Sequence, residues 1–529
     1  MGKVFGIDLG TTYSCIAYVN DFGKAEVVPN MDSSPVTPSV VAFEESGNAS
    51  VGEAAKEVLS SDPANVCSKI KREMGKRDFT YEAFGVEYTP ETISAIILKK
   101  LVKDASDVLG EEVKDVVITC PAYFGMEERN ATETAGKLAG LNVLGILNEP
   151  TAAAISYGMS VDTPQTVLVY DLGGGTFDVT IIQVEGGNIR VIATGGNHEL
   201  GGKDWDDTLR SYLISQYGEI TGEDTNDLIG DLEVMGDLEL KSEKTKKMLS
   251  QKDKATVKVQ SEKIEVTREK FEELTKSLLE STIEMTRKTM GDAEKKGVTH
   301  YDKILLVGGS SIMPQVQERL KAEFPSTPIE FCDPNQSVAK GAAIYGINIA
   351  AFGIGDAPEG ENGDTPQPVN EEAAKNPIFV FGGKSKPQKI NVVNVLSRSI
   401  GMMFVNGINN LVKRNTEVPC DFTIPALTEV DNQTAVNLQV YENLTDEDIV
   451  PEDMCKLLVS DMLDLTEGLP AESPINIKIN ITATGLLNVD VTDMSAGGQT
   501  RHMEVMLQNA LDEQQLKEEE KKIAGLVLE

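Results

Sequence analysis

The chain has 529 residues, 40% hydrophobic and 25% charged, a composition typical of a globular protein with three or four domains. It carries 49 Lys and Arg against 84 Asp and Glu, a formal net charge of −35. So acidic a surface repels phosphate backbones and anionic membranes, which argues against nucleic acids and membranes as partners. No apolar run reaches the ~18 residues of a transmembrane helix, and the N-terminus lacks a signal-peptide pattern, so we expect a cytoplasmic protein.

Strand and helix patterns alternate over residues 1–352. Apolar, β-branched runs that end in glycine or proline predict buried strands at 115–124, 166–175 and 302–311. The spacing of apolar residues predicts helices at 89–110, 126–141 and 267–290. Strands that alternate with helices predict an α/β domain.

The pattern changes after residue 352. Residues 353–377 are rich in Gly, Pro and acidic residues and cannot bury enough apolar surface to offset the entropy of ordering, so we predict a flexible acidic linker over residues 353–389. Short, closely spaced strands with turns such as NGIN and DNQ then predict an all-β domain over residues 390–505. A charged helical stub, residues 506–529, follows.

The strongest signal is a glycine-rich motif that occurs twice, each time after an apolar strand. GIDLGTTYS spans Gly6–Ser14, and DLGGGTFDVT spans Asp171–Thr180. Glycine turns let backbone N–H groups face a phosphate, and the threonines add hydroxyl donors. Asp8 and Asp171 end their strands, where they are placed to hold hydrated Mg²⁺. The pair predicts two copies of one subdomain that clamp a nucleoside polyphosphate between them.

Other phosphate-binding motifs fit less well. NHELGGKD, residues 197–204, has Asn at the first glycine position of a P-loop and Asp after its Lys, and no GxGxxG follows a strand. A third glycine pair, Gly308–Gly309, ends another apolar strand. Two interpretations of this pair stay open: close backbone approach to an adenosine, or an ordinary strand-to-helix turn.

Seven segments resemble the DnaK-type seventy-kilodalton heat-shock chaperones. They are GIDLGTTYSC, NEPTAAAISYG at Asn148–Gly158, DLGGGTFD, GGKDWD at Gly201–Asp206, LVGGSS, and RNTEVP with DNQTAV, and the likeness extends from residue 3 to about residue 505. The resemblance implies an actin-like ATPase domain of duplicated ribonuclease-H-like subdomains over residues 1–352. It also implies a peptide-binding β sandwich over residues 390–505, here without the family's full helical lid.

The same resemblance implies cofactors and partners. ATP or ADP with Mg²⁺ would occupy the clamp, and unfolded or extended polypeptides would bind the sandwich. J-domain co-chaperones and nucleotide-exchange factors are candidate partners. The activity would be slow ATP hydrolysis in protein folding and the stress response.

Residue roles also come from the resemblance. Lys71 in KIKRE matches the lysine that orients the attacking water, Glu149 matches a carboxylate near the metal-bound water, and Asp178 matches an acid that polarises it. The catalytic set is Lys71, Glu149, Asp171, Thr176 and Asp178, and the metal set is Asp8 and Asp171, through water. The nucleotide contacts are Gly10, Thr11, Thr12, Tyr13, Gly173, Gly174, Gly175, Gly201, Gly202, Glu243, Lys246, Lys247, Ser250, Gly308, Gly309, Ser310 and Asn335. The peptide groove is Val436 and Leu438, with Ile408 and Ile475 as weaker candidates.

Simpler interpretations stay open without the resemblance. Lys71 alone is a charge on a helix or loop. Glu243 and Lys247 are four residues apart and could form an ordinary ion pair on a solvated helix face. The four groove candidates could be plain sandwich core.

The chain also departs from the family pattern. Lys247 and Ile312 stand where arginines are usual, and Asn335 replaces an aspartate, all on the adenosine side. A guanidinium stacks on adenine better than an ammonium does. In the interdomain segment KINVVNVLSRSIGM, residues 389–402, Asn391 and Asn394 replace acids, so docking of this linker on the ATPase domain is an open question.

We therefore predict an ATP-dependent chaperone of the DnaK type. One alternative is a small-molecule kinase of the same superfamily, which would not need the β domain that contains DNQTAV. The other is a non-hydrolysing adaptor that binds ATP and scaffolds partners. The linker and lid departures favour the adaptor, whereas the intact catalytic set favours the ATPase.

Overall fold

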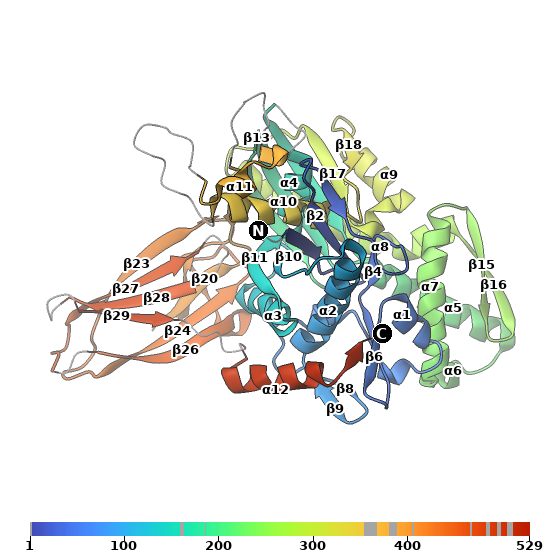
Figure 1. Cartoon of the computed structure of the whole chain (residues 1–529), viewed down its shortest axis with the longest axis horizontal. Helices are drawn as coiled ribbons and strands as arrows, with labels where there is room; N and C mark the ends of the chain where they lie inside the picture. The colour runs from blue at the N-terminus through green and yellow to red at the C-terminus, as the bar shows by residue number, and fades with distance from the viewer. Residues whose placement is uncertain are drawn as a thin grey trace.

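The computed structural model describes residues 3–158, 163–185, 187–353, 368–379, 389–404, 407–465, 468–482, 487–494, 499–504 and 511–528. Figure 1 shows a large α/β N-terminal domain with a β sandwich beside it. The predicted α/β class is confirmed. In the part of the chain that is described, no helix is both long and apolar enough to cross a membrane.

The N-terminal domain is built from two mixed sheets with the same strand order. The first sheet is β11-β10-β1-β2-β3, with β4 beside β2, and the second is β18-β17-β12-β13-β14, extended by β19 and β22. In each, a central strand pairs antiparallel with the next strand and parallel with a later one. The bounds in the first sheet are β1 Val4–Asp8, β2 Tyr13–Val19, β3 Ala25–Val27, β4 Thr37–Pro38, β10 Asp115–Cys120 and β11 Asn142–Asn148. Those in the second are β12 Gln165–Leu172, β13 Phe177–Glu185, β14 Asn188–Asn197, β17 Lys303–Val307 and β18 Ile329–Phe331.

Two helices join the sheets through one shared core. Small residues of α4 (Glu149–Gly158) and α10 (Ser337–Phe352) pack with apolar side chains from both sheets. The backbones approach so closely that a Cβ on Gly341 would lie 1.8 Å from the Ala152 oxygen. The two halves are therefore held together below the cleft that separates their upper parts.

Other helices cover the outer faces. Helices α2 (Pro90–Leu109) and α3 (Met126–Leu138) pack on the first half, and α5 (Gly202–Thr221), α8 (Arg268–Glu294) and α9 (Pro314–Glu323) pack on the second. The ends of α2 follow from its sequence. The Thr89 side chain accepts the Thr92 N–H, Pro90 takes the first position, and Gly110 ends the helix at a φ of 68°.

A smaller unit stands above each half. On the first, β5 (Val40–Phe43), β6 (Asn48–Val51) and β7 (Val66–Ser68) carry the short helix α1 (Glu53–Val58). On the second, α6 (Asn226–Gly230) and α7 (Leu232–Leu249) pack near the hairpin of β15 (Lys254–Val259) and β16 (Glu262–Thr267). These units form the upper walls of the cleft. A further hairpin joins β8 (Tyr81–Ala83) to β9 (Val86–Tyr88).

The β sandwich contains one sheet of order β25-β21-β20-β24-β26 and another of order β23-β27-β28-β29. Alternating apolar side chains of both sheets meet in one core. The bounds of these strands are β20 Ser399–Phe404, β21 Gly407–Val412, β23 Cys420–Leu427, β24 Ala435–Asn443, β25 Ile449–Val450, β26 Lys456–Asp464, β27 Pro474–Ile481, β28 Leu487–Asp493 and β29 Gln499–Glu504. Strand β22, Glu417–Val418, instead pairs with β19 in the second N-terminal sheet.

The prediction of a flexible linker at 353–389 was wrong for residues 368–379. They form α11 (Glu371–Ala374) and a 3-10 turn that ends at Phe379, whose side chain has 0% exposure. Phe379 packs edge-on against Phe352, with the ring centroids 5.2 Å apart. Phe379 belongs to the apolar run IFVF, residues 378–381, which directly follows the polar stretch 353–377 on which the linker prediction was based. Residues 354–367 and 380–388 lie outside the described residues.

The start of the sandwich at residue 390 also needs correction. Asn391–Val395 form β19, which pairs parallel with β14 and antiparallel with β22. The interdomain segment is thus a strand of the second N-terminal sheet, although Asn391 and Asn394 replace the usual acids. The sandwich proper begins with β20.

The predicted helical stub is α12 (Glu513–Ala524), followed by the short strand β30 (Val527–Leu528). Figure 1 shows α12 beneath α2 and α3, on the N-terminal domain. Strand β30 pairs with β6. Residues 505–510 and 529 lie outside the described residues.

Candidate functional site

The two glycine motifs form hairpins that face each other across the cleft. One is the turn between β1 and β2, and the other is the turn between β12 and β13. A Cβ on Gly174 would lie 2.1 Å from Oγ1 of Thr12, and a Cβ on Gly175 would lie 2.3 Å from the Thr11 side chain. Only glycine permits this approach. This contact brings the ends of β1 and β12 together, so that Asp8 and Asp171 lie close to each other.

A cavity of about 490 Å³ opens above the hairpins, a suitable size for a nucleotide. Its lining joins predicted residues from both halves of the domain. They are Asp8, Gly10, Thr11, Thr12, Tyr13, Lys71, Glu149, Asp171, Gly173, Gly174, Thr176, Glu243, Lys246, Lys247, Ser250, Gly308, Gly309, Ser310 and Asn335. Of the other predicted residues, Gly175 belongs to the second hairpin, Gly201 approaches it, Gly202 bonds to Gly173, and Asp178 is the strand partner of Asp171.

Lys71 forms a buried ion pair with Glu149 at the floor of this cavity. Lys71 lies in the 3-10 helix Ile70–Glu73 of the first half, and Glu149 begins α4. Burial lowers the pKa of Lys71, but attraction to Glu149 and Asp8 outweighs it and raises that pKa above its ordinary value. The lysine therefore stays protonated, with Nζ available to a phosphate or to an attacking water.

Three further carboxyl groups share this floor. Burial, with repulsion from Glu149, raises the pKa of Asp8 to about 7, and the same causes raise the pKa values of Asp171 and Asp178 well above the ordinary range. Oδ1 of Asp178 accepts the Ala122 N–H at 3.1 Å, while its buried Oδ2 has no hydrogen-bond partner. One lysine cannot neutralise this set. A divalent cation would compensate these carboxyl groups in their ionised forms.

The donor set fits a hydrated rather than a directly bound metal. Among the residues that the structure describes, no three or more His, Cys, Asp or Glu side chains are placed to bind a metal ion directly. Mg²⁺ usually keeps several of its waters. Asp8 and Asp171 would therefore hold it through water, the arrangement expected from the sequence.

Four side chains connect the upper walls on the side where the sequence predicts the adenosine. Lys56 of α1 forms an ion pair with Glu243 of α7 at 2.5 Å, and Lys247 forms one with the same carboxylate at 2.6 Å. Both ammonium groups also lie 2.9 Å from the Tyr13 hydroxyl. Burial raises the pKa of Glu243, but attraction to the two lysines outweighs this and lowers the pKa to about 2. The ion pair of Glu243 with Lys247 that the sequence allowed is present. Lys56 adds a second ion pair to Glu243 from the opposite wall of the cleft.

Sequence reasoning missed Lys56 and also Arg72. Arg72 donates to the Gly175 carbonyl from Nε at 2.9 Å and from Nη2 at 2.6 Å, and Nη2 lies 2.7 Å from Asp204 Oδ2. One arginine thus ties the first half to the second phosphate hairpin and to the start of α5. Its position next to Lys71 in KIKRE was the only signal in the sequence.

The four groove candidates belong to the sandwich interior to different degrees. Leu438, Ile408 and Ile475 are buried, whereas Val436 is only partly buried against the core. Leu438 and Ile475 belong to the hydrophobic core of the sandwich. A peptide-binding role for Val436 stays a prediction.

We expect the nucleotide-free protein to lose stability as pH rises from 5 to 8. Asp8 ionises near 3.8 when unfolded and near 7 in the folded chain, so the folded state binds this proton more tightly. That contribution is complete below the lower pKa and is lost as pH rises through the higher one. Melting temperatures in a metal chelator should show the slope, and Asp8→Asn should reduce it. The exposed Asp32→Asn should leave it unchanged, and equal slopes for both variants would contradict the assignment.

Comparison with known families agrees with this geometry. The family model described as Hsp70 protein matches residues 4–83, 78–351 and 376–525. Together these matches span nearly the whole chain. Members of that family are chaperones, generally ATPases that bind ATP or ADP with Mg²⁺, and they typically bind unfolded polypeptides and co-chaperones. The chain therefore belongs to the Hsp70 family.

Proposed function

We propose that this protein hydrolyses ATP in the cleft of its N-terminal domain and that the nucleotide controls polypeptide binding by its β sandwich. The observation that carries the proposal is the interdomain strand β19. It extends the sheet that contains the second phosphate hairpin. Nucleotide-dependent movement of that half would act directly on the connection to the sandwich.

The residues of the cleft have separable roles in this proposal. Backbone N–H groups of both hairpins and the Thr11, Thr12 and Thr176 hydroxyls would bind the phosphates. Lys71 would orient the attacking water and stabilise charge on the transferred phosphoryl group. Asp178, whose Oδ2 is unpartnered, would accept a hydrogen bond from that water. Mg²⁺, when bound, would supply charge neutralisation at the phosphates.

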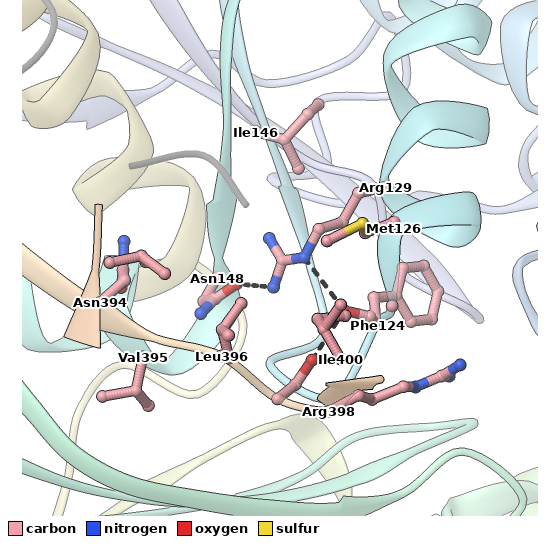
Figure 2. A pocket seen from close by; sticks show the side chains of 13 residues that line it. Phe124, Met126, Arg129, Ile146, Asn148, Asn394, Val395, Leu396, Arg398 and Ile400 are labelled. Carbon is pink, nitrogen blue, oxygen red and sulfur yellow. Dashed lines mark hydrogen bonds between the residues drawn. The ribbon is translucent and has the colours of Figure 1, made fainter. Parts of the chain in front are cut away.

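The interdomain segment also contacts the catalytic region. Figure 2 shows the small pocket where Asn394–Arg398 meet the N-terminal domain, with Arg129 aimed at Asn148 and Phe124. The Phe124 carbonyl accepts from Ser397 Oγ at 3.1 Å and from Arg129 Nε at 3.0 Å. The Phe124 ring lies 5.9 Å from Lys71 Nζ. One residue thus contacts both the connection between the domains and the proposed catalytic lysine.

A buried charge cluster fixes the sandwich to the first half. Arg398 forms ion pairs with Glu128 of α3 and with Glu442 of β24. Lys456 of β26 forms one with Glu127. The Met126 side chain packs into the hydrophobic core of the sandwich. Polar and apolar contacts together make a specific docked state.

Lys71→Ala should reduce single-turnover ATP hydrolysis by roughly 100-fold or more, since it removes a group that acts on the transition state. ATP affinity should remain nearly unchanged, because the hairpins supply most phosphate contacts. Lys76→Ala is a matched control, with a side chain that is 51% exposed and paired with Glu73. Turnover at the wild-type rate in Lys71→Ala would remove this lysine from the mechanism.

Arg398→Ala should undock the sandwich. It leaves the buried Glu442 and Glu128 without their shared cation, a loss of about 3–5 kcal/mol of docking free energy. Faster hydrogen exchange in β19 and a larger radius of gyration by X-ray scattering would report it. As a control, Lys413→Ala removes a solvent-exposed ion pair with Asp448, both of whose residues belong to the sandwich. This variant should change neither the exchange of β19 nor the radius of gyration. Unchanged exchange in Arg398→Ala would mean that the cluster does not hold the domains together.

Single-turnover hydrolysis with and without an extended apolar peptide tests the proposed function. Hydrolysis that the peptide accelerates supports the coupled chaperone. ATP binding without turnover, and without a peptide effect, would favour a non-hydrolysing adaptor instead. Val436→Phe should weaken binding of a labelled peptide and leave basal hydrolysis unchanged, because Val436 lies in β24 of the sandwich and does not line the cleft cavity.

A further inference from the structure

The C-terminal segment 511–528 is attached to the wall of the nucleotide cleft. Strand β30 extends the sheet of β6, β5 and β7, with Val527 opposite Asn48 and Leu528 opposite Ala49. The Val527 N–H points to the Gly47 oxygen at 3.4 Å, and Lys103 Nζ donates to the Leu528 oxygen at 3.2 Å. Figure 1 shows the end of the chain beside β6 and α1.

Helix α12 fixes this strand in place. Ile523 is 2% exposed and belongs to the hydrophobic core of the first half, against which Leu516, Leu526 and Leu528 also pack. The buried Glu519 accepts from the Thr92 hydroxyl at 2.5 Å, and Lys522 donates to the Glu87 oxygen at 2.7 Å. An apolar anchor and specific hydrogen bonds thus support the docked position.

Strand β6 leads directly into the part of the wall that closes the cleft. Gly52 follows β6 and begins α1, whose Lys56 pairs with Glu243 of the opposite wall. The walls also touch at the end of α1, since a Cβ on Gly236 of α7 would lie 1.9 Å from the Leu59 oxygen. A shift of β6 would therefore move Lys56 away from Glu243.

We propose that the C-terminal segment 511–528 is a brace that slows nucleotide release. It completes the sheet that carries α1 and so holds Lys56 against Glu243 across the mouth of the cavity. Undocking of the segment loosens β6, separates the two walls and opens the exit for ADP. The inference rests on the proposed nucleotide function and adds a regulator of that site.

Two adjacent substitutions in the full chain test the brace. Ile523→Asp places a carboxylate in the core and should undock the segment, while Ala524→Asp adds the same group at the neighbouring, exposed position. Release of tritiated ADP, chased with excess ATP, should be about three- to tenfold faster in Ile523→Asp and unchanged in Ala524→Asp. Val527→Pro, which removes the N–H directed at Gly47, should act in the same direction with little effect on the core.

A double substitution tests the route through Lys56. Lys56→Ala should itself speed release, and Ile523→Asp should then add nothing further. Hydrogen exchange of residues 48–58, measured without nucleotide, should also be faster in Ile523→Asp. Equal release rates in wild type, Ile523→Asp and Val527→Pro would overturn the brace, as would an undiminished effect in the Lys56→Ala background. A wild-type chain that binds no ADP would overturn the proposed function, whereas the exchange measurement would still report on the brace.

Discussion

Burial of four carboxyl groups around one lysine is the constraint from which much of this structure follows. The contact between the glycine hairpins brings Asp8 and Asp171 together, and Glu149 and Asp178 complete the set around Lys71. Charges removed from water must be compensated. Raised pKa values show that the protein alone compensates this set only partly. The two halves therefore meet around a site that a cation and phosphates would complete.

The relative position of the two halves also affects the sandwich, because both halves of the N-terminal domain contact it. Arg398 and Lys456 bind acids of the first half. Arg414 pairs with Asp292 of α8 at 3.0 Å, and β19 joins the sheet of the second half. If the halves rotate about their shared core, both sets of contacts cannot stay unchanged. In the proposed function, a docked sandwich would therefore respond to the relative position of the halves without contacting the nucleotide.

Local sequence patterns predicted the features that depend on local chemistry. Glycine turns after apolar strands predicted both hairpins, because backbone conformation decides these positions, and the spacing of apolar residues predicted the helix that is α2. Long-range partners were not predictable in this way. Packing of Phe379 depends on the distant Phe352, and β19 was assigned to the sandwich because its pairing depends on the distant edge of β14. Without the family resemblance, Lys71 would have remained one charge among many.

The adenosine side shows how a substitution can change the source of cleft closure. A guanidinium stacks on a base, whereas the Lys247 ammonium is a compact charge that binds Glu243 and lies 4.8 Å from the Tyr13 ring centroid. Lys56 reaches the same two residues from the opposite wall. Ile312 adds an apolar, partly exposed surface to the cavity in place of a second cation. In this chain the two walls are connected by the ion pair of Lys56 with Glu243, so elements that position α1 would influence opening of the cleft in the proposed function.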